Sequence, residues 1–453
     1  MDKVKPLREE PVSDMGGPAG SGAKEDMAQV PVQGAERAKG AAFAATSGPL
    51  RAVRALSSPV YRFYYYALLS HMACMNMQLI ARSLLIYRLT GSSWILGLMA
   101  LAQALPMMAL SLIGGVIADR LQKKYVVMLG QAVSSLVALG VAVLLGIGYL
   151  SSDRTGAWVV LVVASLLQGT VMGLMMPSRQ ALVAEIVPAE HLMNAVALNV
   201  LGMNTLRIFA PALAGFIIDR FGFETVYYLI CAMYLSAVLF LIPLPLARIK
   251  KRRLEGLLAD LKTGLHYVRQ ESTILHLLIL ALFLVVLSMP YMFLMPVFAD
   301  DILMVGATGM GLLFAVSGLG AMAGSITLAV LPNKKRGAML LGSGLLLGVG
   351  LLGFSFSRSW TVSVVLMVFV GLGHSGRMTL SNTLLQYYVA DEYRGRVMSL
   401  YLMEFGMMGV GVFIAGAMAE YLGVEWAVGG LAGALVLVCL LGMGFFPRIR
   451  KLD

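Results

Sequence analysis

A series of twelve long apolar runs constrains this chain more than any other feature of its sequence. Each run approaches or exceeds the roughly 20 residues that a helix needs to cross a bilayer. The runs lie at 62–89, 93–118, 125–149, 157–187, 191–218, 224–246, 273–299, 306–331, 338–356, 360–388, 392–420 and 424–446. Because the connections are short, no room remains for a folded catalytic domain outside the membrane. Hydrophobic residues make up 59% of the 453 residues, and the mean hydropathy is +0.82, which excludes a soluble enzyme.

The runs form two groups of six, which predicts an all-α membrane protein built from two six-helix bundles. The bundles are expected at 56–246 and 273–446. Residues 1–55 are rich in Gly, Ala, Pro and mixed charge and are expected to form a disordered cytoplasmic tail, with no signal peptide. Residues 247–272 place leucines at helical spacing under a basic face, typical of a cytoplasmic helix lying in the interface; a calmodulin-type target is the alternative. Residues 447–453 form a second cytoplasmic tail.

Basic residues predict the orientation, because cytoplasmic connections of membrane proteins carry an excess of Lys and Arg. One set of connections holds Arg120, Lys123, Lys124, Arg179, Arg248, Lys250, Lys251, Arg252, Arg253, Lys334, Lys335, Arg336, Arg394, Arg396, Arg448, Arg450 and Lys451. The other set holds Arg154, Arg220, Arg358 and Arg88. The first set, with both termini, is predicted to be cytoplasmic and the protein to lie in the cell membrane.

The two halves resemble each other at a constant offset between 180–222 and 381–423. Glu190 aligns with Asp391 before the span, and Asp219 aligns with Glu420 at its far end. Identical glycines align within and after the span at Gly215/Gly416 and Gly222/Gly423. A parallel repeat of this kind implies two bundles related by an axis along the membrane normal, with a cavity between them and alternating access by rocking.

The remaining composition limits cofactors and partners. Three cysteines lie far apart inside apolar runs, so neither a disulfide nor a metal site is expected. The net charge of +11 is spread over the ends of the runs, which argues against nucleic acid. No phosphate-binding loop is encoded, so no nucleotide cofactor is expected. We expect a monomer that contacts membrane lipids and a small-molecule substrate.

Charged side chains inside the apolar runs are the candidate substrate contacts. Placing a charge near the centre of the bilayer costs roughly 2.5 to 3.5 kcal/mol on insertion scales, so each one needs a partner or a function. Arg207 lies near the middle of the fifth run and either clamps buried carbonyls or faces an anionic substrate. Arg82 in the first run is interpreted as snorkelling to the outer interface, with substrate contact as the alternative. Asn76 is a weaker candidate that interhelical hydrogen bonding can explain.

Arg377 and Glu404 lie at similar depths in the tenth and eleventh runs, so adjacent helices can pair them. A fixed ion pair is one interpretation. The other makes Glu404 a proton carrier, with His374 as a second candidate, and the proton the coupling ion. Many methionines lie in the fourth, seventh, tenth and eleventh runs, where they suit either a wall that accepts varied apolar shapes or ordinary packing.

The connection after the second run resembles the loop signature of major facilitator superfamily transporters, G-x-x-x-D-R-x-G-R-[RK]. It holds Gly115, Asp119, Arg120, Lys123 and Lys124. It departs from the signature at Gln122, where Gly is usual, and by having Lys in place of Arg at the following position. The resemblance implies a conformational latch, in which Asp119 accepts from amides at the start of the eleventh helix and the three cations pair with carboxylates or lipid phosphates.

The fifth run is similar to the Gly- and Pro-rich helix of exporters in that superfamily, at Pro211 and Gly215, although Ala210 and Ala214 stand where Gly is common. The segments PSRQALVAEIVPAEHLMNAVAL and DEYRGRVMSLYLMEFG are similar to the branch that includes enterobactin exporters and macrolide efflux proteins. The resemblance implies transport, and export as its direction. Together with the candidate residues, it leads us to expect proton-coupled efflux of a hydrophobic or amphipathic molecule of the drug or siderophore class. The surplus of cations over acids inside the apolar runs favours an anionic one. The alternatives are an importer of an anionic metabolite or lysophospholipid, and a membrane sensor or scaffold that does not transport.

Overall fold

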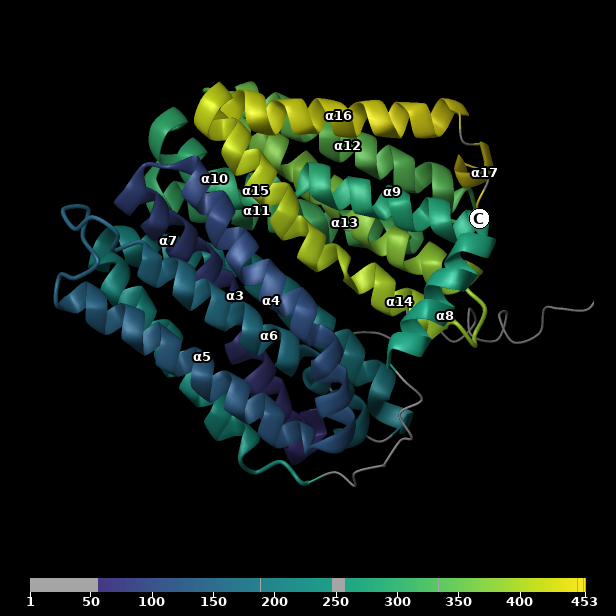
Figure 1. Ribbon diagram of the computed structural model, residues 1–453, viewed down its shortest axis with the longest axis horizontal. Helices are drawn as coiled ribbons and strands as arrows, with labels where there is room; N and C mark the ends of the chain where they lie inside the picture. The colour runs from purple at the N-terminus through teal and green to yellow at the C-terminus, as the bar shows by residue number, and fades with distance from the viewer. Residues whose placement is uncertain are drawn as a thin grey trace, which may run out of the picture. The chain divides into compact units, whose positions relative to one another are not determined.

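Long α-helices make up most of the described part of the chain (Figure 1). The structure, a computed structural model, describes residues 56–187, 189–246, 257–332, 334–445, 447–450 and 452. The chain divides into residues 1–50 and 51–453, and every described residue belongs to the second part. The expected tail at 1–55 therefore lies outside the described residues.

The first half of the described chain contains α3 (Pro59–Thr90), α4 (Ser93–Arg120), α5 (Lys123–Gly146), α6 (Val159–Ile186) and α7 (Ala189–Leu241). After α8 (Leu257–Gln270), the second half contains α9 (Ser272–Ser288), α10 (Pro290–Val297), the π-helical turn η2 (Phe298–Ile302), α11 (Gly306–Val330), α12 (Arg336–Phe356), α13 (Trp360–Tyr388), α14 (Arg394–Leu402), α15 (Glu404–Leu422), α16 (Val424–Phe445) and α17 (Pro447–Arg450).

The turn between α3 and α4 illustrates how local sequence ends one helix and starts the next. Gly91 adopts a left-handed conformation with φ 62°, which ends α3 without the steric cost that a side chain would add. Ser92 then caps α4 by accepting a hydrogen bond from the amide of Ile95. The entry of α3 uses the same chemistry, with Ser58 as the cap and Pro59 at the first helical position.

Among the described residues, ten helices are long and apolar enough to cross a membrane. The count takes α7 as one helix, but Gly222, at φ 82° and ψ 171°, divides it into two spans. Gly423, the aligned glycine of the second half, has φ 88° and ψ 151° and separates α15 from α16 in the same way. The predicted total of twelve also needs α3 as a span, and that count stays a prediction.

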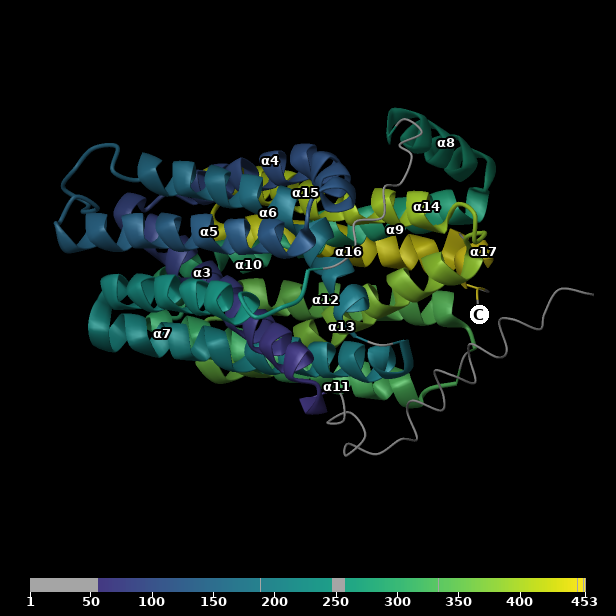
Figure 2. The same ribbon diagram turned by 90° about the horizontal axis from the view of Figure 1, so that it is seen from below.

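The helices pack in two groups that meet along two helix pairs (Figures 1 and 2). In the first group α3 packs on α7, α4 on α6, and α5 on both α6 and α7. In the second group α11 and α12 pack on α13, and α12 also packs on α16. The groups join where α7 contacts α11 and where α4 contacts α15. We call the two groups the N-terminal and the C-terminal bundle.

The helix α8 lies at the same end of the helices as α14 and α17 (Figure 1). Its Tyr267 stacks on Tyr393 with ring centroids 4.1 Å apart and an angle of 4° between the ring planes. The Tyr267 hydroxyl accepts a hydrogen bond from the amide of Ala390 at 3.2 Å. This helix therefore contacts the chain that enters α14.

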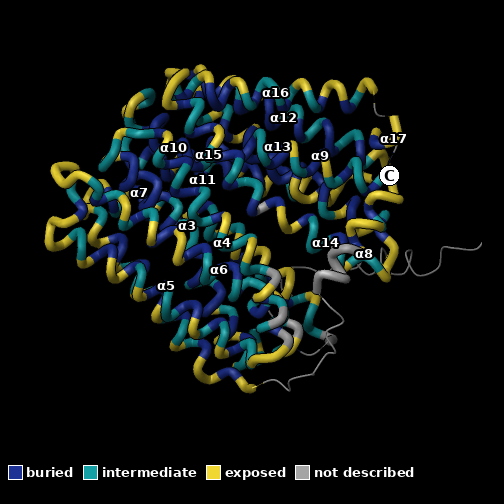
Figure 3. The backbone as a smooth tube through the Cα atoms, viewed as in Figure 1, coloured by how far each residue is buried: buried dark blue, intermediate teal, exposed yellow. Residues whose placement is uncertain are grey.

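Exposed positions recur along the lengths of the helices as well as at their ends (Figure 3). Many of these exposed residues are large and apolar. Leu129 is 67% exposed and Leu136 66%, both on α5. Large apolar residues exposed along helices of this length belong in contact with lipid rather than with water. The protein is thus a multi-pass membrane protein.

Candidate functional site

A cavity of about 370 Å³ lies between the two bundles. Its walls come from α3, α4, α6 and α7 on one side and from α9, α10, α13 and α15 on the other. The lining combines apolar residues with a few polar ones, as is usual in small-molecule sites. The residues are Met72, Met75, Asn76, Gln78, Leu79, Arg82, Gln103, Gln168, Met172, Arg207, Val285, Met289, Met292, Phe293, His374, Arg377, Met378, Glu404 and Met408.

Arg82 lies in the wall that the N-terminal bundle provides. Its side chain is 5% exposed, and Nη2 donates to Oε1 of Gln103. The Nε and Nη1 atoms are buried and have no hydrogen-bond partner. The snorkelling interpretation of Arg82 is therefore wrong: the guanidinium turns inward because Gln103 on α4 offers a buried acceptor there.

The structure brings Arg377 and Glu404 together in the opposite wall. Nη1 of Arg377 lies 3.9 Å from Oε2 of Glu404, and both residues are buried. Charge-assisted hydrogen bonds are usually 2.7 to 2.9 Å long, so this is a loose ion pair. Nε and Nη1 of the arginine and Oε2 of the glutamate all lack a hydrogen-bond partner.

The other sequence candidates also reach the cavity. Arg207 lines it from α7 and His374 from α13, where the buried Nδ1 of the histidine has no partner. Asn76 donates to the carbonyl of Met72 at 2.8 Å, within its own helix. Seven methionines from both bundles also line the cavity: Met72, Met75, Met172, Met289, Met292, Met378 and Met408.

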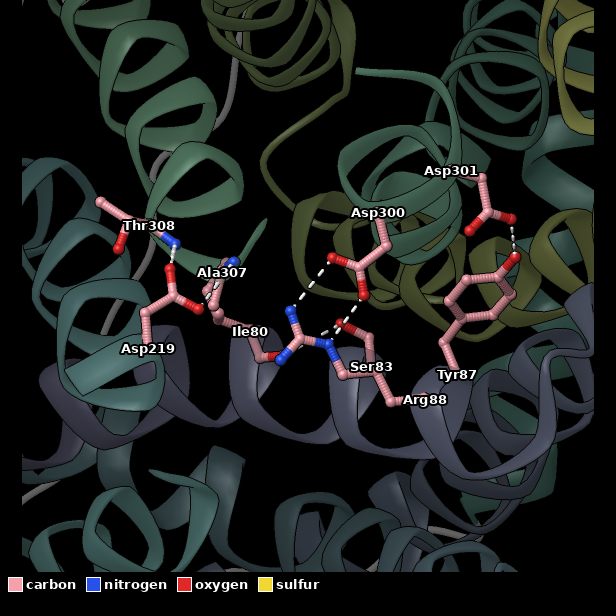
Figure 4. Close-up of polar contacts among 9 residues, drawn as sticks. All are labelled: Ile80, Ser83, Tyr87, Arg88, Asp219, Asp300, Asp301, Ala307 and Thr308. Atoms are coloured by element: carbon pink, nitrogen blue, oxygen red, sulfur yellow. Dashed lines mark hydrogen bonds and ion pairs between the residues drawn. The ribbon is translucent and has the colours of Figure 1, made fainter. Parts of the chain in front are cut away.

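One end of the bundles is joined by carboxylates that cap helices across the interface (Figure 4). Asp219 of α7 accepts from the amide of Ala307 at 3.3 Å and from that of Thr308 at 2.7 Å. These amides belong to the first turn of α11, where backbone donors have no partner inside the helix. The carboxylate also meets the positive end of the helix dipole.

The aligned residue of the second half makes the equivalent contact. Glu420 of α15 accepts from the Ser92 hydroxyl at 3.0 Å and from the Trp94 amide at 3.1 Å, at the start of α4. Gly215 and Gly416, also aligned, lie against the first turns of the same two helices, where a side chain would collide with backbone. The repeat in the sequence thus corresponds to a repeated contact between the bundles.

Two further contacts join the same end. Arg88, at the end of α3, pairs with Asp300 of η2, with Nε 2.7 Å from Oδ2 and Nη2 3.1 Å from Oδ1 (Figure 4). Tyr87 donates its hydroxyl proton to Asp301. Neither Asp300 nor Asp301 was among the site residues predicted from the sequence, although two adjacent acids at the end of an apolar run are a visible signal. We call the contacts of Asp219, Glu420, Arg88 and Tyr87 the clamp.

The predicted latch lies at the opposite end of α4. The side chain of Asp119 is outside the described residues, so its contact with the eleventh helix stays a prediction. Lys123 pairs with Glu185 at 2.5 Å, and Lys124 donates to the carbonyls of Ile242 and Leu244 at 2.6 and 2.7 Å. Both contacts stay within the N-terminal bundle. Arg120 is exposed and Gly115 has open space where a side chain would begin.

The exporter-type residues of the fifth run lie where α7 contacts α11. Gly311 of α11 approaches the carbonyl of Pro211, and Gly215 approaches Ala307. Arg179, which the sequence analysis assigned to a connection, lies instead inside α6, with a buried Nη1 atom that has no partner. That assignment is therefore wrong.

Comparison with known proteins identifies the chain. Residues 51–453 match the family model described as transmembrane secretion effector. The chain belongs to this family of the major facilitator superfamily. The staphyloferrin A transporter of Staphylococcus aureus is 24% identical over 333 residues, covering 73% of this chain and 82% of the relative. The enterobactin exporter EntS of Shigella flexneri is 26% identical over 354 residues, covering 76% and 81%.

Solved structures of major facilitator transporters share the fold. A bacterial homologue of the human lysosomal transporter Spinster, in an inward-facing and unoccupied conformation, has a TM-score of 0.68 at 14% identity and covers 87% of this chain and 98% of its own. The nucleoside transporter NupG has a TM-score of 0.65 at 13% identity, with 85% and 99% covered. As a member of the superfamily, the chain is a secondary transporter.

Proposed function

We propose that this protein exports an acidic, partly apolar small molecule of the siderophore class by alternating access. The observation that carries this proposal is the placement of Arg82, Arg207 and Arg377 around one cavity that seven methionines also line. Guanidinium groups bind carboxylates with two parallel hydrogen bonds, and flexible thioethers adapt to varied apolar shapes. The names of the relatives, an exporter of enterobactin and a transporter of staphyloferrin A, support the substrate class.

The proposed orientation places both termini in the cytoplasm and the clamp outside. Lys and Arg are concentrated in the connections at the end opposite to the clamp, and cytoplasmic loops carry this excess. With the clamp formed, the outer end is closed. A cavity of about 220 Å³ between α4, α6, α14 and α15 extends from the central region toward the other end, which supports access from the cytoplasm.

We propose Glu404 as the site at which a proton gradient acts. Its buried carboxylate faces Arg377 and lines the cavity, so a change in its charge alters the binding site directly. Glu404→Gln is expected to abolish the response of transport to a pH gradient while exchange of substrate between the two sides continues. A response that persists in this variant would remove Glu404 from the coupling mechanism.

The test of the function is transport in vesicles. The full chain is reconstituted into liposomes in a single orientation, which limited proteolysis from outside verifies. Radiolabelled staphyloferrin A or enterobactin is then supplied on the cytoplasmic face. We expect accumulation inside the vesicles that Arg377→Gln abolishes. Arg154→Gln, which removes an exposed arginine outside both the cavity and the clamp, is the matched control. Transport of neither compound, with transport of a cationic dye instead, would overturn the proposed substrate class.

A further inference from the structure

The charges in the cavity do not balance. Among its described lining residues are three guanidinium groups and one carboxylate, which leave two positive charges when His374 is neutral. A buried charge without a partner is costly, so this lining favours an anionic ligand. A ligand that brings two negative charges makes the occupied cavity neutral. This deepens the proposed function, on which it rests, by specifying the ligand.

The free hydrogen-bond donors of Arg82 belong to the N-terminal bundle. Gln103 occupies Nη2, which leaves Nε and Nη1 buried and unpartnered. Because only 5% of the residue is exposed, bulk water does not form hydrogen bonds with these donors. A buried donor of a charged group without a partner destabilises the protein, and a ligand carboxylate that accepts its hydrogen bond removes that cost.

The free donors of Arg377 belong to the C-terminal bundle. This residue is 3% exposed, and its Nε and Nη1 are unpartnered as well. Glu404 is the neighbouring carboxylate, but at 3.9 Å it does not form the short, forked contact of which a guanidinium is capable. A ligand carboxylate can therefore take this position in competition with Glu404.

We propose that the ligand is a dianion with two separated carboxylates, one bound by Arg82 and the other by Arg377. Each bundle supplies one of the two arginines, so the ligand bridges the bundles through its two ends. The methionines that line the same cavity accommodate the apolar middle of the ligand. Arg207, also in the lining, adds to the positive potential and contacts neither end in this assignment. Neutral or singly charged compounds leave one arginine unsatisfied and bind weakly.

The test measures binding by the purified full chain, without transport. The probes are straight-chain dicarboxylates of increasing length, from succinate to sebacate, each compared with its half-amide, which keeps the length and removes one charge. Affinity is measured by calorimetry and by the shift in thermal unfolding. We expect an optimal length at which the diacid binds at least tenfold more tightly than its half-amide.

Three variants identify the ends of the ligand. Arg82→Gln and Arg377→Gln are each expected to reduce the preference for diacid over half-amide to less than about twofold, because one end then gains nothing from its charge. Glu404→Gln removes the competitor for Arg377, keeps the preference and tightens binding by about tenfold. Arg154→Gln, in the exposed loop between α5 and α6 and outside the clamp, is expected to leave all affinities unchanged. The thermal transition of each variant without ligand verifies that it is folded.

Equal affinity for diacid and half-amide at every length, or no binding by any diacid, overturns this assignment. So does a preference that survives Arg82→Gln in folded protein. A different result contradicts the proposed function. If the protein prefers diacids but does not transport siderophores in vesicles, the dianion site stands and the proposed transport substrate is wrong. If the protein transports staphyloferrin A but binds diacid and half-amide equally, the proposed function stands and the dianion site is wrong.

Discussion

The clamp and the cavity both place charged side chains between the same two bundles, but they differ in how these charges are satisfied. At the clamp, Asp219 and Glu420 each accept from donors at the start of a helix in the opposite bundle. In the cavity, Arg82 and Arg377 keep buried donors without partners. Carboxylates that already have partners across the interface stabilise one arrangement of the bundles. Buried guanidinium donors without partners instead favour the binding of an anion. Under the proposed function, the same interface has one region that holds a conformation and another that recognises a substrate.

The largest effect is expected where a side chain is inserted into the clamp end. Gly416→Leu adds atoms against the backbone of Ser93 and Gly97, and overpacking of a close contact costs about 1 to 3 kcal/mol. We expect the outer end to be held open and transport to fall more than tenfold. Gly433→Leu in α16, where the added atoms meet open space, is the control.

Spin labels at Ser152→Cys and Ser359→Cys, exposed positions in loops of the two bundles, report the separation of the outer ends in a background without the three native cysteines. The Gly416→Leu variant is expected to lengthen the distance between the labels. An unchanged distance together with normal transport would mean that the close contact at Gly416 does not control this end.

A smaller effect is expected from removing the two capping charges. A carboxylate at a helix N-terminus contributes about 0.3 to 1 kcal/mol, so Asp219→Asn with Glu420→Gln should weaken closure by up to about 2 kcal/mol. That shifts the ratio of open to closed protein by up to roughly 30-fold. Each single variant should give about half the effect on a logarithmic scale, because the two sites share no partner.

The same pair of spin labels measures this shift. Asp153→Asn, which neutralises an exposed acid in the loop between α5 and α6, is the matched control. If one single variant gives the whole effect and the other none, the two caps do not act as an equivalent pair despite their aligned positions.

The smallest effect is expected at Arg88. Its pair with Asp300 is partly exposed, with 36% and 19% of the two side chains accessible, and such pairs contribute about 0 to 1 kcal/mol. Arg88→Gln should therefore shift the distribution of label distances by less than about fivefold, and the difference from the parent should shrink in high salt. A larger shift than that of the double capping variant would reverse the order proposed for the clamp contacts.

The sequence predicted the elements of this architecture better than their contacts. Apolar runs, and the constant spacing between aligned residues of the two halves, can be found in the sequence alone. The helices and the equivalence of Asp219 with Glu420 were therefore predictable without a structure. The partners of these carboxylates, at the starts of α11 and α4, depend on how the bundles pack, and no spacing in the sequence contains that information.

The same distinction applies to the cavity. Similar depth in adjacent helices was enough to predict the proximity of Arg377 and Glu404, which lie 3.9 Å apart. Depth alone misassigned Arg82, because an arginine in the outer third of a span can turn outward to the interface or inward to an acceptor. The acceptor, Gln103, comes from a neighbouring helix, and its position relative to α3 is a tertiary feature.

The unbalanced charge of the cavity has a consequence for turnover. A carrier that reorients without cargo must enclose two uncompensated positive charges, whereas a carrier that returns with an anion encloses none. The empty return step is therefore expected to limit the cycle, and substrate supplied on the far side should accelerate efflux from the near side. In kinetic terms, such a protein behaves as an exchanger that also permits slow net flux.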